Sequence, residues 1–467
     1  MPTQDSTFEA LAIVARAGAD YRRRIGAAET TPVESYADAL ARFAEPVPNR
    51  GGESAAIVEE LIAKAEGGIR AMTAPRFFGW VIGSSHLTGV AADWLTSAWG
   101  QNCANVLAAP AACAVEAVVA GWVLDLLHLP RECSVGVVSG ATVANTVCLA
   151  AARGEVLRRT GWDVEARGLF GAPEITVMIG ADAHATVFSG LRYLGLGAER
   201  VVRIPTDPLG RMRPEALATA LEGHSGPLIV IAQAGQINTG VSDPFEQIAP
   251  LVRAAGGWLH VDGAFGLWAA ASPKYRHLVA GFELADSWGT DGHKWLQTPY
   301  DGSFAIVRDE AAHRRAMSIT ASYLPTASSD ERDPTAYVME LSRRARGFAM
   351  WAMIKQLGRE GIARMVEQDV AVAQEMAAGI AAIDGAELVD EPELNQFMVR
   401  FGDEDALTLA TVEQIQRDAV AFIGASQWRG QWVMRVSVSS IATTPEDGRI
   451  TVAAVRAAWE KVRPRAG

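Results

Sequence analysis

The residues that could do chemistry begin with a carboxylate and a lysine, each placed directly after an apolar run. Asp262 ends the segment GWLHVD, and Lys294 lies in the segment TDGHKW. A carboxylate at the end of a buried strand is unfavourable unless a cation pairs with it, although an Asp before Gly also commonly caps a turn. A lysine in an apolar pocket has a lowered pKa and can form a Schiff base with a carbonyl, although most lysines are solvated surface residues. Seen alone, neither residue decides between a structural and a chemical role.

Two further segments offer an anion site and a flat ring. The segment VVSGATVAN, at 137–145, places small residues between a β-branched strand and a helix. Small residues let backbone amides approach an anion, and the N-terminus of the helix adds positive charge, although such turns also simply link a strand to a helix. His184, in the segment DAHAT, could likewise be an N-terminal helix residue without a chemical role.

Pyridoxal phosphate is the cofactor that uses all four features together. Its phosphate needs an anion site, its aldehyde a lysine, its pyridine nitrogen a carboxylate and its flat ring a stacking partner. A carboxylate that keeps the nitrogen protonated makes the ring an electron sink. The alternative, a nucleotide-phosphate loop at 139–145, lacks both the P-loop lysine and a GxGxxG pattern.

The elements that must position these residues follow from the hydrophobic pattern. Apolar runs without polar alternation predict strands that are buried on both faces, and hence a mostly parallel sheet wrapped by helices, an α/β fold. Ligands bind such open sheets at the carboxyl ends of the strands, which is where Asp262 lies. The expected strands are 134–138, 175–179, 201–204, 228–232, 258–261, 287–290 and 303–307.

Three units are expected along the chain: an N-terminal helical arm at 1–75, a large cofactor-binding α/β domain at 76–345 and a C-terminal α+β domain at 346–467. The arm is alanine-rich and is broken at TTPVES and PVPNRGGES, a pattern typical of helices that pack on another body. The C-terminal domain is expected to contain a helix at 347–357, strands at 396–401 and 432–438, and helices at 407–423 and 445–462.

Composition excludes several classes of partner. The 467 residues carry 42 Lys and Arg against 54 Asp and Glu, a formal charge of −12, which argues against nucleic acid or an anionic membrane as a partner. The most apolar stretch, 111–130, contains Glu116 and Asp125, so we expect a buried helix and no membrane span. The four cysteines lack CxxC or metal-ligand spacing, so we expect no metal site and a reducing cytoplasm.

On these motifs the sequence resembles the group II pyridoxal-phosphate-dependent decarboxylases, which include the aromatic amino acid, glutamate and histidine decarboxylases. The resemblance runs from RFFGWVIGSS at Arg76 through SGATVAN, DAHATV, AGQINTGVSDPF, HVDGAFG and DGHKW to SRRARGFAMW at 342–351. It implies an aspartate aminotransferase-like fold (the type I fold of these enzymes) with a large, mostly parallel sheet domain and a small C-terminal α+β domain. It also implies a homodimer with active sites at the interface.

The resemblance further implies a role for each matched residue. Lys294 would hold the cofactor's aldehyde as an internal aldimine, and Asp262 would pair with the pyridinium nitrogen. Ala264 would lie under the ring, and His184 would stack on the opposite face near the substrate carboxylate. The phosphate contacts would come from Ala141, Thr142 and His293.

The implied reaction is decarboxylation of an L-amino acid to its amine and CO2, through an external aldimine and a quinonoid. Two alternatives stay open: a lyase, aldolase or aldehyde synthase on the same fold, and a non-catalytic scaffold. The loop at 324–337 should carry a tyrosine that protonates the quinonoid carbon, but Pro334 lies near that position, with Tyr323 and Tyr337 on either side. The presence of the complete lysine, aspartate and histidine set argues against the scaffold.

The substrate wall differs from that of family members that act on aromatic amino acids. The segment FFGWVI at 77–82 stands where those members usually have an FFAYFP-like stretch, and QNCANV at 101–106 has no aromatic residue. Gln236 stands where a threonine is common, and His86 is either a pocket residue or a helix N-terminal residue. Burying an indole or catechol without ring partners forfeits about 1–3 kcal/mol. We therefore expect a small, aliphatic or polar substrate in preference to tryptophan or dopa, and the lack of an available arginine argues against glutamate and aspartate.

Overall fold

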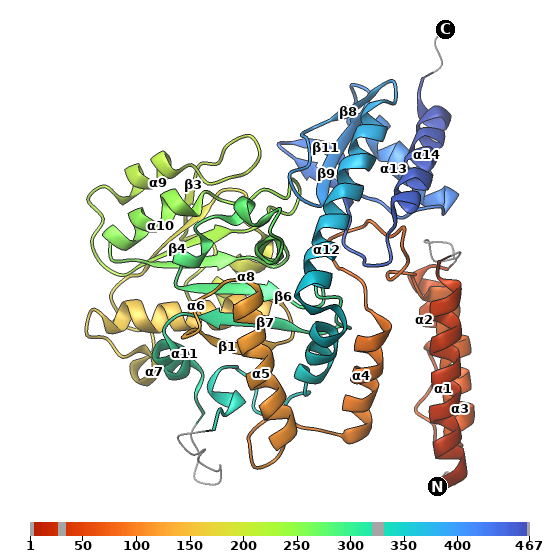
Figure 1. The fold of residues 1–467 in the computed structure, drawn as a ribbon, viewed down its shortest axis with the longest axis horizontal. Helices are drawn as coiled ribbons and strands as arrows, with labels where there is room; N and C mark the ends of the chain where they lie inside the picture. The colour runs from red at the N-terminus through yellow and green to blue at the C-terminus, as the bar shows by residue number, and fades with distance from the viewer. Residues whose placement is uncertain (1–3, 27–33, 320–330, 465–467) are drawn as a thin grey trace.

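The computed structural model describes residues 4–26, 34–319 and 331–464. A broad body holds a large sheet, a smaller body is built on a second sheet, and the N-terminal helices stand at one side (Figure 1). One long helix, α12 (Gly347–Ala381), runs between the two bodies.

The large sheet has seven strands in the order β1-β7-β6-β5-β4-β2-β3. The strands from β2 to β6 run parallel, and β7 lies antiparallel between β1 and β6. Each expected strand is found within one residue of its predicted ends, and the predicted α/β class is confirmed. The strands are β1 (Ser134–Val138), β2 (Thr176–Gly180), β3 (Val202–Ile204), β4 (Leu228–Gln233), β5 (Trp258–Asp262), β6 (Ser287–Asp291) and β7 (Ser303–Val307).

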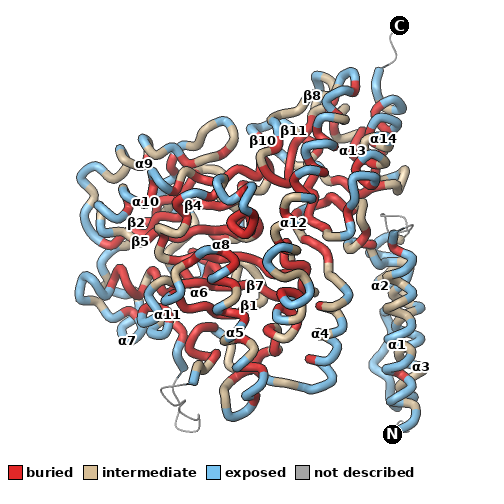
Figure 2. The backbone as a smooth tube through the Cα atoms, in the orientation of Figure 1, coloured by how far each residue is buried: buried red, intermediate tan, exposed pale blue. Residues whose placement is uncertain are grey.

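The sheet is buried on both faces because its strands are apolar at successive positions. Val230 of β4 belongs to the hydrophobic core on one face, while Ile229 and Ile231 belong to the core on the other. Figure 2 shows the resulting band of buried backbone through the large body.

The helices of this body are α4 (Leu87–Trp99), α5 (Pro110–Leu126), α6 (Ala141–Arg158), α7 (Val164–Arg167), α8 (Ala185–Tyr193), α9 (Pro214–Leu221), α10 (Phe245–Ala254) and α11 (Glu310–Met317). Short 3₁₀ helices lie at Glu66–Gly68, Gly266–Ala271, Arg276–Val279, Phe282–Leu284 and Pro334–Ala336.

The smaller body has an antiparallel sheet in the order β10-β11-β9-β8 and its own hydrophobic core. The helix expected at 347–357 continues through α12, but Gly358 interrupts it with a left-handed φ of 61°, so the prediction stopped where the helix bends. The elements are β8 (Ala386–Leu388), β9 (Gln396–Phe401), β10 (Gly424–Trp428), β11 (Gln431–Ser437), α13 (Asp405–Asp418) and α14 (Pro445–Val462). The sequence did not predict β8 or β10.

The N-terminal arm consists of α1 (Gln4–Arg24), α2 (Tyr36–Phe43) and α3 (Ser54–Ala65), and α1 packs along α3 (Figure 1). The arm contacts the large body where the Arg22 guanidinium donates to the Ser85 hydroxyl at 3.0 Å and to the Ser85 carbonyl at 2.6 Å. No helix within the described ranges is both long enough and apolar enough to cross a bilayer.

The sheet topology gathers the predicted motifs at one edge. Val138 of β1 and Asp291 of β6 both pair with Ser303, so these two strands end at the same edge although they are not neighbours. Asp262 at the end of β5 pairs with Gln233 of β4, at the same edge. Since β2 pairs in parallel with β4, the turns that carry the small residues, the histidine, the carboxylate and the lysine lie along the same edge of the sheet.

Candidate active site

Lys294 lies on the turn after β6, and its amine faces a carboxylate. The Nζ atom is 3.0 Å from Oδ2 of Asp291, the last residue of β6. Asp291 is buried, and within the described part of the chain its other carboxylate oxygen has no hydrogen-bond partner. The ring of Phe265 forms an apolar wall 6.0 Å from Nζ. Sequence reasoning named Asp291 only as a neighbour in TDGHKW, because nothing in the motif says which carboxylate the amine meets.

Asp262 is a buried carboxylate without a direct cationic partner. Its Oδ1 accepts a hydrogen bond from the Ala264 amide at 3.3 Å, which is the turn-capping contact that the sequence allowed. Burial raises the pKa of Asp262, while the nearby charges of His184 and Lys294 lower it. Among the described residues no Lys or Arg forms an ion pair with this carboxylate. A pyridinium N–H would supply the missing partner, so the site fits a protonated pyridine ring.

His184 occupies the helix N-terminal position that the sequence allowed, and it also lines a cavity with Asp262. It is the N-cap of α8, where its Nδ1 accepts from the Thr186 amide at 3.4 Å and lies 2.7 Å from the Thr186 hydroxyl. Its ring also lines the same small cavity as Asp262. Burial lowers the pKa of His184, so the ring is held neutral and can lie flat against an aromatic cofactor.

The turn before α6 provides an anion site. Gly140 is the N-cap of α6, and Ala141 and Thr142 form its first turn, where backbone amides lack intrahelical partners. A Cβ built on Gly140 would lie 3.7 Å from Cε1 of His293, so this histidine lies over the turn. The His293 ring packs at 4.3 Å, between centroids, against Tyr300. The structure thus brings the three predicted phosphate contacts together.

The smaller body contributes a cation that the sequence reasoning missed. Arg435 of β11 donates to the Ile237 carbonyl at 3.4 Å and to Oδ1 of Asn238 at 3.3 Å. Burial lowers the pKa of Arg435, and its charge lowers the pKa of His184. Within the described ranges Arg435 forms no ion pair with a carboxylate. The available signal was an arginine inside the apolar run VMRVS, far in sequence from the matched motifs.

Comparison with known proteins decides the family. The model of the pyridoxal-dependent decarboxylase conserved domain matches residues 38–401. The chain belongs to this family. An aromatic-L-amino-acid decarboxylase of Sus scrofa is 29% identical over 422 residues, which are 87% of this chain and 84% of that protein. A 4-hydroxyphenylacetaldehyde synthase of Rhodiola rosea is 25% identical over 437 residues, covering 89% and 88%. The crystal structure of Oryza sativa TDC with PLP and tryptamine has a TM-score of 0.91, covers 99% of both chains and is 22% identical.

The family membership settles the cofactor and the class of reaction. The protein is a pyridoxal-phosphate-dependent carboxy-lyase that decarboxylates an amino acid. The predicted aspartate aminotransferase-like fold is confirmed by the likeness to solved decarboxylases of this family. The buried carboxylate, the amine and the anion turn described above are the groups that this cofactor requires.

The sequence left open the roles of three residues, Tyr337, Tyr323 and His86. The Tyr337 hydroxyl donates to Oε1 of Glu310 at 2.5 Å, in a cavity at the amino end of β1, which is the edge opposite the site. Tyr323 lies outside the described residues. His86 is the N-cap of α4, where its Nδ1 accepts from the Thr88 amide at 3.2 Å. The helix N-terminal alternative therefore describes His86.

Proposed function

We propose that the protein removes the carboxyl group of an L-amino acid as CO2 and releases the amine, with Lys294, Asp262 and His184 as the catalytic residues. The observation that carries the proposal is the convergence of the Lys294 amine and the Asp262 carboxylate at one sheet edge, where the charge of Lys294 lowers the pKa of Asp262. Bound pyridoxal phosphate supplies an electron sink for the bonding pair that the leaving CO2 leaves behind.

Each residue of the chain then has a stated task. Lys294 binds the aldehyde carbon of the cofactor, and Asp262 keeps a proton on the ring nitrogen. His184 covers one face of the ring, and Ala264 covers the other. The phosphate is held by Ala141, Thr142 and His293. What supports this assignment is the common sheet edge, the shared cavity of His184 and Asp262, and the position of His293 over the turn.

Covalent labelling tests the assignment of Lys294. Borohydride reduction followed by peptide mapping should place the pyridoxyl group on Lys294, and Lys294→Ala should abolish turnover while the protein still folds. Lys274 is the matched control, because its amine lies over the Tyr275 ring outside the site and Lys274→Ala should keep full activity. Labelling on any other lysine would contradict the proposal.

Arg435 is proposed to bind a carboxylate of the substrate. A half-buried cation that lacks an acidic partner gains from an anionic ligand, since part of its hydration has already been lost. Arg435→Gln should raise KM at least about tenfold, the range for loss of a charge-assisted hydrogen bond. Arg429, which is already paired with Asp182 at 2.8 Å, gives the control variant Arg429→Gln, for which KM should change little.

A second candidate is an aldehyde synthase. It is favoured by the Tyr337 hydroxyl, which is held by Glu310 at the opposite edge, and by Pro334 near the position expected for the proton-donating tyrosine. In that reaction the amino acid, O2 and water give the aldehyde, CO2, ammonia and hydrogen peroxide. Measuring amine against aldehyde, ammonia and peroxide separates the two reactions, because a decarboxylase gives CO2 and amine in equal amounts without consuming O2.

The substrate is proposed to be a small, aliphatic or polar amino acid. The proposal rests on the residues at 77–82 and 101–106, of which Val81 belongs to the hydrophobic core. The relative from Sus scrofa is named for aromatic amino acids, so the choice needs a direct test. In a steady-state comparison of valine, glutamate, aspartate, tyrosine and tryptophan, we expect kcat/KM for valine to exceed the values for tyrosine and tryptophan. A highest value for tryptophan or tyrosine would overturn the proposal.

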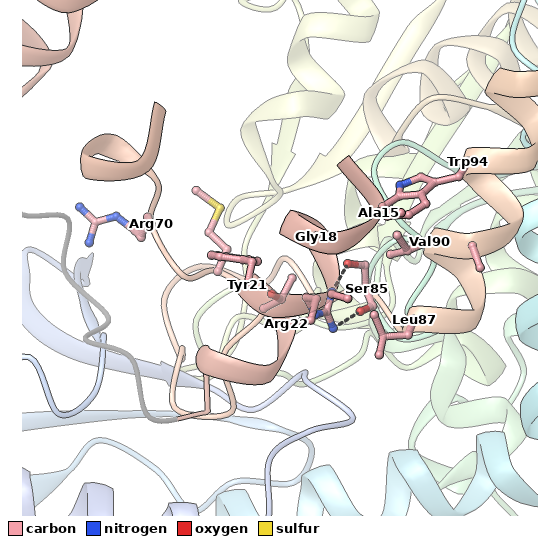
Figure 3. Close-up of a pocket in the computed structure, with 13 residues that line it drawn as sticks. Ala15, Gly18, Tyr21, Arg22, Arg70, Ser85, Leu87, Val90 and Trp94 are labelled. Atoms are coloured by element: carbon pink, nitrogen blue, oxygen red, sulfur yellow. Dashed lines mark hydrogen bonds between the residues drawn. The ribbon is translucent and has the colours of Figure 1, made fainter. Parts of the chain in front are cut away.

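The active form is proposed to be a homodimer in which the arm packs on a partner chain. The arm carries exposed apolar side chains on all three helices, among them Phe8, Leu40 and Leu61. Between α1 and α4 lies a cavity of about 520 Å³ lined mostly by apolar residues, including Val90 and Trp94 (Figure 3). An obligate interface typically buries more than about 2,000 Å², which would cover these surfaces. Light scattering that shows a well-behaved, cofactor-loaded monomer would contradict the dimer.

The cytoplasm is proposed as the location. The four cysteines, Cys103, Cys113, Cys133 and Cys148, are buried and unpaired by disulfides, which suits a reducing compartment. Fractionation of the source cells should place the activity with the cytoplasmic proteins.

A further inference from the structure

A run of buried polar side chains leads from the core of the large sheet toward Asp262. The Trp258 indole donates to the Ser287 hydroxyl at 2.9 Å, and this hydroxyl lies 2.9 Å from Nδ1 of His260. Nε2 of His260 lies 3.1 Å from Oδ1 of Asn145, on the second turn of α6. His260, Ser287 and Asn145 have no exposed surface, so water cannot replace any of these contacts.

The chemistry of the donors fixes the direction of every bond in this run. An indole can only donate, so the Ser287 oxygen accepts from Trp258. The Asn145 oxygen that faces Nε2 of His260 can only accept, so Nε2 is the ring nitrogen that donates, and Nδ1 of a neutral ring accepts from the Ser287 hydroxyl. Burial lowers the pKa of His260 to about 3, so the ring is neutral and carries its one hydrogen on Nε2. Nε2 therefore donates to the amide oxygen of Asn145, and the NH2 end of that amide is left over.

The remaining NH2 group faces the carboxylate that the cofactor needs. Within the described chain, the Asn145 Nδ2 atom is buried and has no acceptor at full hydrogen-bond geometry. It acts on Asp262, whose pKa it lowers. Gly289, which pairs with Asp262 on the neighbouring strand, leaves the room for this arrangement, since a Cβ there would lie 2.4 Å from Oδ1 of Asn145.

We propose that His260 is a positioning residue, which fixes the orientation of the Asn145 amide and thereby keeps Asp262 ionised against the ring nitrogen of the cofactor. The inference rests on the role proposed above for Asp262. If the amide turned over, its oxygen would face the carboxylate and its NH2 would face the Nε2 hydrogen, which are two repulsive contacts in place of two attractive ones. The hydrogen on Nε2 thus selects the orientation in which a donor supports the negative charge.

The decisive measurement is binding to the apoprotein and needs no turnover. Pyridoxal phosphate is compared with its 1-deaza analogue, which carries a C–H group in place of the ring nitrogen. His260→Phe keeps a ring of similar size but removes the donor, and it should weaken the binding of pyridoxal phosphate by about tenfold, the usual effect of losing a group that orients a ligand-binding residue. Binding of the analogue should be unchanged, because the analogue presents no ring nitrogen to Asp262.

Two further variants and one control complete the design. His260→Gln restores a side-chain N–H near the position of Nε2 and should recover most of the affinity for pyridoxal phosphate. Asn145→Leu should behave like His260→Phe. His313→Phe removes another fully buried histidine, one whose Nε2 contacts a backbone carbonyl, and it should leave the ratio of the two affinities unchanged.

The outcomes separate this inference from the role of Asp262. Equal loss of affinity for both ligands in His260→Phe would make His260 merely structural and would overturn the inference. An equal loss of affinity for both ligands in Asp262→Asn, with their ratio kept at the wild-type value, would instead show that Asp262 does not pair with the ring nitrogen. If His260→Phe fails to fold, nitrogen NMR of wild-type apoprotein decides: a hydrogen on Nδ1 of His260 contradicts the proposal, and one on Nε2 supports it.

Discussion

His260 and His313 occupy two regions of the large body with nearly the same bonds. Nδ1 of His260 contacts Ser287 at 2.9 Å and Nδ1 of His313 contacts Ser134 at 2.8 Å. Burial lowers the pKa of each ring to about 3. The difference lies beyond Nε2, which meets the Asn145 side chain at 3.1 Å in one region and the Tyr337 backbone carbonyl at 2.9 Å in the other.

The different partners of Nε2 explain how similar hydrogen bonds of a buried histidine can support only the fold in one region and the cofactor site in the other. A backbone carbonyl has a fixed direction, so His313 simply ties α11 to the residues around Tyr337. A side-chain amide has two ends of opposite character, so His260 determines which end faces Asp262. A buried, neutral histidine therefore affects the cofactor only where Nε2 contacts a side-chain amide, because that amide can adopt two opposite orientations.

Substituting the carboxylate of each region should give the largest difference in kcat/KM between the two regions. Asp262→Asn keeps the size but removes the charge that supports a protonated ring nitrogen, so kcat/KM should fall at least about a hundredfold, or about 3 kcal/mol in the barrier. Glu310→Gln, beside Tyr337 in the region of His313, should leave kcat/KM within about twofold, as expected for a change that does not touch the transition state. Steady-state kinetics of both variants check this prediction. An equally large fall in kcat/KM for Glu310→Gln would contradict the expected difference between the two regions.

Two glycines give a matched pair of smaller changes. A Cβ on Gly289 would lie 2.4 Å from Oδ1 of Asn145, and a Cβ on Gly136 would lie 2.1 Å from the Tyr337 carbonyl oxygen. Each Gly→Ala variant should lower the free energy of unfolding by about 1–3 kcal/mol, since a close-packed interior resists added volume. Only Gly289→Ala should also weaken the affinity for pyridoxal phosphate. Denaturation and cofactor titration of both variants check this, and equal cofactor affinities would break the distinction.

The two histidines should contribute equally to the pH dependence of the free energy of unfolding. Below about pH 6.5, the ordinary histidine pKa, the unfolded chain takes up a proton; the folded chain leaves each ring neutral until the pH approaches about 3. Stability therefore falls as the pH falls, by about 1.4 kcal/mol per pH unit for each histidine. Replacing either histidine by Gln should make the free energy of unfolding less dependent on pH between about pH 6 and pH 4, by the contribution of one histidine. Urea unfolding at several pH values measures this slope. A slope that is unchanged in His313→Gln would show that this ring is protonated in the folded state.

The sequence predicted the strands of the large sheet because each is a continuous apolar run bounded by turn residues, and it predicted the meeting of the four motifs because parallel strands share a carboxyl edge. It could not predict contacts between side chains of distant strands. The pairing of Lys294 with Asp291, the cation of Arg435 and the bonds of His260 all depend on packing that no local pattern encodes. The short edge strand β8 carries too few residues to show a period. The unit limits at 75 and 345 and the roles of the site residues remain predictions.

The bend of α12 at Gly358 bears on how such an enzyme can diversify. A Cβ on Gly358 would meet nothing within 4 Å, so Gly358 itself faces open space, while Ile354 and Ile362 on either side of the bend pack in the core. The groups proposed to hold the cofactor are carried by the large sheet on one side of it, and Arg435 is carried by β11 on the other. Mutations in the smaller body can therefore shift the cation toward differently shaped amino acids while the lysine and its carboxylates stay where they are. Selection could in this way retune substrate preference without rebuilding the chemistry.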